Sequence, residues 1–289
     1  MALAGAICLK MTPALFLAYW AYQRNGKLLA GAVIGLAVLA AALPAAAMGP
    51  DHFAELTGSW WTNVIRPGLT EGEFYPIHVN QSLPGVLSRY LLGGRQGGDI
   101  FYAPDARPGA QGAQHAWIAL ASLSPEAVRW IARALQVCIL GVAAWAIGRR
   151  KLPRDDGRRG LHYAIVLLAM MLLNQRTWDH HAAVLLPAAV AVWYAIAFGR
   201  VGAGARKAAL ALMLIAGPLV WLTGTETFEL AAKLTGRSET TGELWADLSQ
   251  AWGLTFYHFA LVFAAAVLLA VRLGRQAEPY ADRRLKLNE

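Results

Sequence analysis

The chain has 289 residues, of which 57% are hydrophobic and 15% are charged, and its formal net charge is +8. Its mean hydropathy is +0.39. Several apolar runs reach about 20 residues, the length that an α-helix needs to cross a hydrocarbon core of about 30 Å. The composition therefore predicts an all-α, polytopic membrane protein and excludes a large soluble helical protein.

We expect about seven membrane-spanning helices. In chain order they lie at residues 2–22, 29–48, 126–148, 161–177, 181–198, 208–223 and 253–272. The predicted organisation is one integral membrane domain over residues 1–289, with a long extracytoplasmic loop at 49–125 and a cytoplasmic tail at 273–289. A re-entrant or interfacial helix within that long loop stays an open alternative.

Basic residues gather in the short connections that follow the first, third and fifth predicted spans, and in the tail. RRKLPRDDGRR at 149–159 is the densest of these runs. The positive-inside rule assigns this side of the membrane to the cytoplasm. The same rule accounts for the net charge, so a nucleic-acid partner is not indicated. With seven spans and a cytoplasmic C-terminus, Met1 starts outside, and we expect further helices upstream of it.

The two cysteines, Cys8 and Cys138, each fall within a predicted span and have no CxxC spacing. They are therefore expected to be packing residues rather than disulfide or metal-binding residues. The sequence also has no P-loop, GxGxxG, HExxH or GxSxG motif in a suitable context, which leaves nucleotide hydrolysis, metalloprotease and serine-hydrolase chemistry without support.

Lys10 is the first candidate functional residue, because it lies inside the first predicted span. A lysine within a membrane costs a few kcal/mol and is a functional hypothesis by default. Snorkelling of the long side chain to the outer headgroups is the alternative. Pro13, in the sequence KMTP, is expected to open the helix locally and leave a polar notch beside Lys10.

The sequence NQSLPGVLSR at 80–89 contains the next candidates, which are Asn80, Gln81, Ser82 and Arg89. The pattern predicts a turn that leads into a helix, with Ser82 as its N-cap and Pro84 at an early helical position. The alternatives to a binding role are a simple cap and turn, or a chance N-x-S sequon.

The most titratable cluster of the chain is TWDHH at 177–181, which Arg176 precedes. Trp178 suits the aromatic belt at a membrane interface. His180 and His181 point about 100° apart on a helix, and the turn offers too few ligands for a metal site. Recognition of a phosphate by Arg176, His180 or His181, together with Lys10 and Arg89, fits better. Asp179 is placed to orient one of the histidines.

Three stretches, in this order, resemble segments of one known family. LKMTPALFLAYWAYQRNGK (9–27) resembles a K-x-T-P-x-L-F-L-x-Y helix, NQSLPGVLSR (80–89) an N-Q-S-L-x-G-x-x-x-R segment, and TWDHHAAVLLPA (177–188) an S/T-W-x-H-H-x-x-x-L-L-P segment. The family is glycosyltransferase family 87, the polyprenyl-phosphate-mannose-dependent membrane transferases similar to phosphatidylinositol mannosyltransferases. The resemblance covers most of residues 5–200.

The resemblance implies a GT-C-like, all-helical hexosyltransferase of the bacterial plasma membrane, with its active site at the extracytoplasmic face. Its implied partners are a polyprenyl-phosphate sugar donor that carries a hexose, with mannose expected, a lipid or glycan acceptor, and membrane lipids. It implies no cofactor and leaves a divalent cation open. The implied groups for the departing phosphate are Lys10, Arg89, His180 and His181, with Asn80 and Gln81 as hydrogen-bond donors.

The sequence departs from the family pattern before Lys10. Family members carry about a hundred or more residues there, including a loop with the catalytic aspartate. Asp51 and Asp179 are the outer carboxylates available as a substitute base. The chain is then a fragment, a partner of a separate N-terminal polypeptide, or inactive alone. A non-catalytic binding or assembly protein and a transporter of a lipid-linked substrate are the competing functions.

Overall fold

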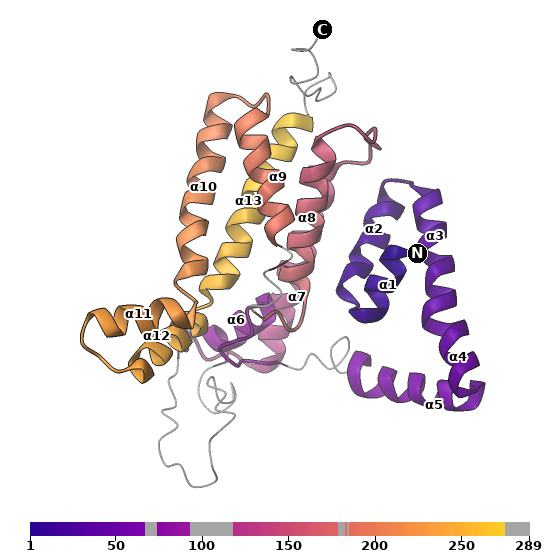
Figure 1. Ribbon diagram of the computed structural model, residues 1–289, viewed down its shortest axis with the longest axis horizontal. Helices are drawn as coiled ribbons and strands as arrows, with labels where there is room; N and C mark the ends of the chain where they lie inside the picture. Colours follow the sequence, from indigo (N-terminus) through magenta and orange to yellow (C-terminus); the bar gives the residue numbers. More distant parts are fainter. Residues whose placement is uncertain (67–73, 93–117, 179–182, 184, 275–289) are drawn as a thin grey trace. The chain divides into compact units, whose positions relative to one another are not determined.

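A computed structural model describes residues 1–66, 74–92, 118–178, 183 and 185–274 (Figure 1). Within these ranges every regular element is a helix, and the only bridge of the β type is an isolated one between Leu92 and Ser122. The prediction of an all-α protein is confirmed. Residue contacts divide the chain into two compact units, Met1–Glu73 with Gly148–Pro153, and Phe74–Ile147 with Arg154–Glu289.

The first unit begins with a helix that breaks where Pro13 predicts a break. α1 ends at Leu9, and Lys10 follows in extended backbone with φ −157° and ψ 129°. Proline cannot donate the helical hydrogen bond, and its ring clashes with the carbonyl of the residue four positions earlier. Residues 2–22 therefore form two eight-residue helices instead of one continuous span. The elements are α1 (Ala2–Leu9), η1 (Thr12–Ala14) and α2 (Leu15–Tyr22).

The rest of the first unit is a long apolar helix followed by a second helix that turns away from it. The long helix runs from Gly26 to Met48 and includes a π-helical turn. Gly35 lets α1 pack against it closely, since a Cβ there would lie 2.7 Å from the Cβ of Ala4. The elements are α3 (Gly26–Leu36), η2 (Ala37–Ala42), α4 (Leu43–Met48), α5 (Pro50–Trp60) and η3 (Trp61–Ile65).

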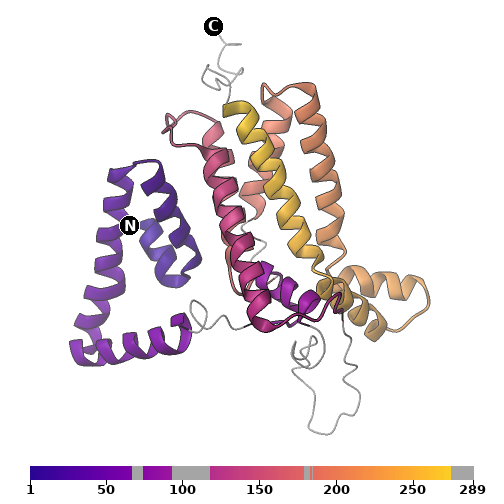
Figure 2. The same ribbon diagram turned by 180° about the vertical axis from the view of Figure 1, so that it is seen from behind.

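The second unit is a helical bundle with α13 in its interior (Figures 1 and 2). α13 packs against α7, α8, α9 and α10. Phe259, Val262 and Leu269 of α13 are fully buried, as are Ile165 and Leu168 of α8. The elements are α6 (Leu83–Leu91), α7 (Pro125–Ile147), α8 (Arg158–Leu173), α9 (Leu185–Phe198), α10 (Ala203–Trp221), α11 (Thr225–Leu234), α12 (Glu239–Ala251) and α13 (Leu254–Gly274).

Among the described residues, four helices are long and apolar enough to cross a membrane: Gly26–Met48, Pro125–Ile147, Ala203–Trp221 and Leu254–Gly274. They correspond to the predicted spans at 29–48, 126–148, 208–223 and 253–272. The spans expected at 161–177 and 181–198 correspond to the shorter helices α8, of 16 residues, and α9, of 14 residues. The described residues thus support a membrane protein, and the number of seven spans stays a prediction.

Candidate functional site

Helix α6 begins as the sequence predicts. The Ser82 hydroxyl accepts a hydrogen bond from the Gly85 amide at 3.1 Å, and Pro84 lies in the first turn. A capping serine satisfies an amide that the helix itself leaves without a partner. The Ser82 hydroxyl also donates to the carbonyl of Gln175 at 3.0 Å. The cap therefore ties α6 to the segment that follows α8.

The side-chain amide of Asn80 strengthens this connection with four hydrogen bonds to backbone groups. Its Nδ2 donates to the carbonyls of Tyr75 and Gln175, at 2.8 and 3.1 Å. Its Oδ1 accepts from the amides of Ser82 and Thr177, at 3.2 and 3.0 Å. The side chain is fully buried. Buried polar groups are stable only when they are paired, so Asn80 fixes the backbone of Gln175 and Thr177 relative to its own turn.

Gln81 makes the corresponding links toward the C-terminal part of the chain. Its Nε2 donates to the carbonyls of His78 at 2.6 Å and Gln250 at 2.8 Å. Its Oε1 accepts from the amide of Phe256 at 3.4 Å, and its backbone amide donates to the carbonyl of Thr177 at 2.6 Å. One side chain thus joins residue 78, the end of α12 and the start of α13.

Arg89 is buried at 3% exposure and directs its guanidinium at backbone carbonyls. Nε donates to Ala251 at 2.8 Å. Nη1 donates to Ile77 at 2.9 Å and Asn80 at 2.8 Å, and Nη2 to Gln250 at 3.3 Å. Burial lowers the pKa of Arg89 to about 10, so the group stays protonated at neutral pH. The described partners of the guanidinium are backbone carbonyl groups, and their dipoles stabilise the buried charge.

The side chains of Asn80, Gln81, Ser82 and Arg89 form what we call the Asn80–Arg89 network. It joins three segments that are distant in sequence: residues 75–92, residues 175–177 and residues 250–256. Gly85 is part of its construction, because a Cβ at that position would lie 2.6 Å from Asn80 Nδ2 and 2.8 Å from the Asn80 carbonyl oxygen. A side chain there would displace Asn80.

The network holds in place a segment that carries exposed functional groups. The Arg176 guanidinium lies 3.3 Å from the ring centroid of Tyr75, and the Arg176 side chain is exposed. Stacking on an aromatic face orients a guanidinium and leaves its N–H edge available to an anion. Its neighbour Thr177 is fully buried, whereas Trp178 is 41% exposed. The segment therefore presents one oriented cation and one aromatic side chain.

A contact between a histidine and an aspartate borders the network on another side. Nε2 of His78 lies 3.2 Å from Oδ1 of Asp247, with the imidazole buried and the carboxylate side chain 41% exposed. The carbonyl of His78 accepts from Gln81, and Asp247 lies one helical turn before Gln250. The structure thus places the exposed carboxylate of Asp247 beside the Asn80–Arg89 network, in contact with the buried imidazole of His78.

The remaining sequence-predicted residues lie in the first unit or outside the described residues. Lys10 is exposed at the end of α1, and Asp51 is exposed in the first turn of α5; both belong to the first unit. Asp179, His180 and His181 lie outside the described residues. The meeting of Lys10, Arg89 and the two histidines in one hollow stays a prediction.

Sequence reasoning did not single out Tyr75, His78, Asp247 or Gln250. The one available signal was the position of Asp247 in the acid-rich segment at 224–252. Within the described ranges no cluster of three or more His, Cys, Asp or Glu side chains could hold a metal ion. The exposed group that suits an anionic ligand is the Arg176 guanidinium, because the polar atoms of the network are already bonded to backbone groups.

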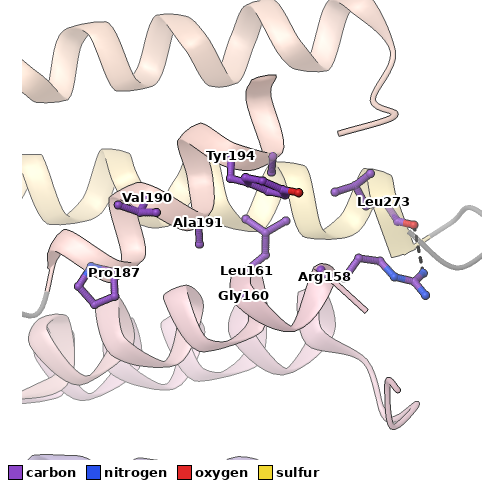
Figure 3. A pocket seen from close by; sticks show the side chains of 10 residues that line it. Arg158, Gly160, Leu161, Pro187, Val190, Ala191, Tyr194 and Leu273 are labelled. Carbon is purple, nitrogen blue, oxygen red and sulfur yellow. Dashed lines mark hydrogen bonds between the residues drawn. The ribbon is translucent and has the colours of Figure 1, made fainter. Parts of the chain in front are cut away.

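A separate cavity of about 310 Å³ lies at the other end of α8 (Figure 3). It is bordered by Pro187, Tyr194 and Leu273 among mainly apolar side chains, with Arg158 at one end. Arg158 is already paired with Asp156 at 2.6 Å. Sixteen helical residues, about 24 Å, separate this end of α8 from the network. The cavity is therefore not part of the candidate site.

The fold and site define an all-helical membrane protein with a buried polar network that positions an exposed guanidinium. The model of glycosyltransferase family 87 matches residues 1–174, more than half of the chain, and the chain therefore belongs to this family. It is also 26% identical over 272 residues to a polyprenol-phosphate-mannose-dependent alpha-(1-2)-phosphatidylinositol mannoside mannosyltransferase of Mycobacterium tuberculosis.

That match covers 93% of this chain and 51% of the relative, so the chain spans about half the length of the curated protein it matches. No solved structure matches the chain. The matched family region ends at residue 174 and therefore includes all four residues whose side chains form the Asn80–Arg89 network. The Gln175–Thr177 backbone and α12, which those side chains contact, lie beyond it.

Proposed function

We propose that this chain moves a mannosyl group from a polyprenyl-phosphate donor to a lipid or glycan acceptor at the extracytoplasmic face of a bacterial plasma membrane. Family membership supports the reaction class. The name of the mycobacterial relative supports the donor and a mannosylated phosphatidylinositol as the acceptor class. The orientation rests on the distribution of basic residues between the predicted spans.

The observation that carries the proposal is the exposed Arg176 guanidinium, stacked on Tyr75 at 3.3 Å. When the sugar leaves its donor, the bond between the anomeric carbon and the phosphate oxygen breaks, and the electron pair stays on the polyprenyl phosphate. A guanidinium oriented before the reaction stabilises this growing negative charge without paying for its own reorganisation. We assign this role to Arg176, assisted by His180, His181 and Lys10.

In this proposal the Asn80–Arg89 network has a positioning role. Asn80, Gln81 and Ser82 use their polar atoms on backbone groups, and Arg89 is buried against carbonyls. They hold the backbone on either side of Arg176 rather than the donor itself. Their loss would move Arg176, Trp178 and the titratable residues that follow, although none of those residues is changed.

The acceptor hydroxyl must lose its proton as its oxygen bonds to the anomeric carbon, and a carboxylate is the suitable base. Asp247 is our first candidate, because its exposed carboxylate is contacted by His78 and borders the network. The imidazole N–H orients the carboxylate, and the proton passes from the acceptor to Asp247 and then to water. Asp51 and Asp179 are the alternatives that the sequence offers.

The test is a transfer assay with the full chain reconstituted in liposomes that contain polyprenyl-phosphate mannose and a phosphatidylinositol mannoside. We expect radiolabelled mannose to appear in the acceptor lipid. Removing one charge-assisted hydrogen bond costs about 1.5–3 kcal/mol, so Arg176→Ala should slow transfer by about 10- to 100-fold. The matched control is Arg237→Ala, because Arg237 is also stacked on an aromatic ring, that of Trp245 at 5.5 Å.

The control variant should retain the wild-type rate. Equal rates for Arg176→Ala and the wild type would contradict the assigned role of Arg176. For the base, Asp247→Asn keeps an oxygen that accepts from His78 and removes the basic carboxylate, whereas Glu243→Gln changes an exposed carboxylate on the same helix. A loss of transfer in the first variant alone supports Asp247. Equal transfer in both would direct attention to Asp51 and Asp179.

A further inference from the structure

The helix that follows the first long apolar helix has two chemically different faces. α5 and η3 form continuous helical backbone over residues 50–65. Within α5 successive residues are about 100° apart, which places Phe53, Leu56 and Trp60 on one side, and Val64 follows Trp60 about one turn later in η3, which is π-helical. The other side carries polar and charged residues at successive turns: Asp51, His52, Glu55, Ser59, Thr62 and Asn63.

The apolar side is open to its surroundings. No residue of α5 or η3 is buried. Leu56 is 46% exposed, Trp60 43%, Trp61 53% and Val64 58%. Leu56, Trp60 and Val64 thus expose three large apolar side chains on one side, with the exposed Trp61 at its border, and such patches mark a surface that contacts another apolar phase. On the polar side, His52 and Glu55 lie 3.6 Å apart and are both well exposed.

The position of this helix indicates which apolar phase it contacts. A single residue, Gly49, separates the membrane-spanning candidate Gly26–Met48 from the start of α5 at Pro50. Gly49, with a φ of +88°, makes the turn between them, a conformation that favours glycine. Figures 1 and 2 show α5 running across the end of α4 rather than continuing it. A helix that turns sideways at the end of a membrane span starts at the depth of the lipid headgroups.

We propose that α5 and η3 bind the surface of the bilayer, with Phe53, Leu56, Trp60 and Val64 inserted at the boundary between headgroups and acyl chains. A helix with a wide apolar face and a polar opposite face takes this orientation. Tryptophan favours the interface, where its ring is buried and its N–H stays solvated. The polar face carries acidic residues and no cluster of basic ones, so apolar burial drives the contact and a zwitterionic bilayer suffices.

The test is electron paramagnetic resonance of single nitroxide labels on the full chain in phosphatidylcholine liposomes. Cys8 and Cys138 are first replaced by serine, and one new cysteine is then introduced. Leu56→Cys, with Val64→Cys as a second variant, reports on the apolar face. Glu55→Cys and Ser59→Cys are the matched controls on the polar face. All four positions are exposed, so substitution there should leave folding intact.

We expect labels at 56 and 64 to collide severalfold more often with oxygen, which partitions into lipid, than with a water-soluble nickel chelate. Labels at 55 and 59 should show the reverse preference. Equal access of the nickel reagent to both faces would overturn the proposal in favour of a solvated helix. Shielding of the apolar-face labels from both reagents would overturn it in favour of packing against protein. Neither outcome depends on sugar transfer.

Discussion

Replacing Asn80 by alanine should release the segment that carries Arg176. Asn80 is fully buried, and its amide makes four hydrogen bonds to backbone groups of Tyr75, Ser82, Gln175 and Thr177. Alanine removes all four. The Gln175 carbonyl keeps its bond from Ser82 at 3.0 Å, but the amides of Ser82 and Thr177 lose the acceptor that Asn80 supplies.

The magnitude follows from those two amides. A buried donor that loses its partner costs about 1–3 kcal/mol, so the two together cost about 2–6 kcal/mol. This is a large part of the stability of an ordinary domain, which is about 5–15 kcal/mol. The Thr177 share, about 1–3 kcal/mol, falls on the 175–177 segment, which keeps only the bonds from the Ser82 hydroxyl and the Gln81 amide to the network. We therefore expect local opening of this segment at temperatures below the main unfolding transition.

Hydrogen exchange of the Thr177 amide in detergent micelles measures this opening directly. The Thr177 amide donates to Asn80 Oδ1 at 3.0 Å in the wild type, so its protection should fall by about 30-fold in Asn80→Ala, the equivalent of about 2 kcal/mol. Asn63→Ala is the matched control, because Asn63 also bonds through its side chain, to Ser59 at 3.1 Å, but is exposed. Unchanged protection of Thr177 in Asn80→Ala would refute the assigned role of the network.

Three further changes test the same structure. Gly85→Ala brings a Cβ to 2.6 Å from Asn80 Nδ2, and the resulting displacement should cost about 1–3 kcal/mol in thermal unfolding. Arg89→Lys keeps the charge but cannot reach carbonyls on two sides, and we expect a loss of about 3 kcal/mol, measured in the same way. Asp156 has its pKa lowered because the hydrogen bonds and charge of Arg158 outweigh the effect of burial. Its contribution to stability is therefore present above its ordinary pKa of 3.8 and lost as the pH falls below it, and Asp156→Asn should flatten the acid side of a stability profile.

Local patterns predicted the local features of this protein well. Ser82 and Pro84 predicted where α6 starts, and Pro13 predicted the break beside Lys10. These features depend on hydrogen bonds and clashes within four residues, which the sequence contains in full. Four of the expected membrane spans appear as long apolar helices for the same reason, since length and composition decide them.

The partners of Arg89 could not be predicted in this way. Its carbonyl acceptors come from residues 77 and 80 and from residues 250 and 251, which only the tertiary fold brings together. A sequence shows that a cation is present but not whether a ligand or the backbone neutralises it. The pairing of His78 with Asp247 has the same origin, because 169 residues separate the two.

The most direct test of the account is an experimental structure of the full chain with polyprenyl phosphate bound. We predict that the phosphate lies within hydrogen-bond distance of the Arg176 guanidinium, with the ring of Tyr75 still stacked behind it and Asn80 still bonded to Thr177. A phosphate that binds away from Arg176, or a 175–177 segment that has separated from Asn80 in the complex, would contradict the account.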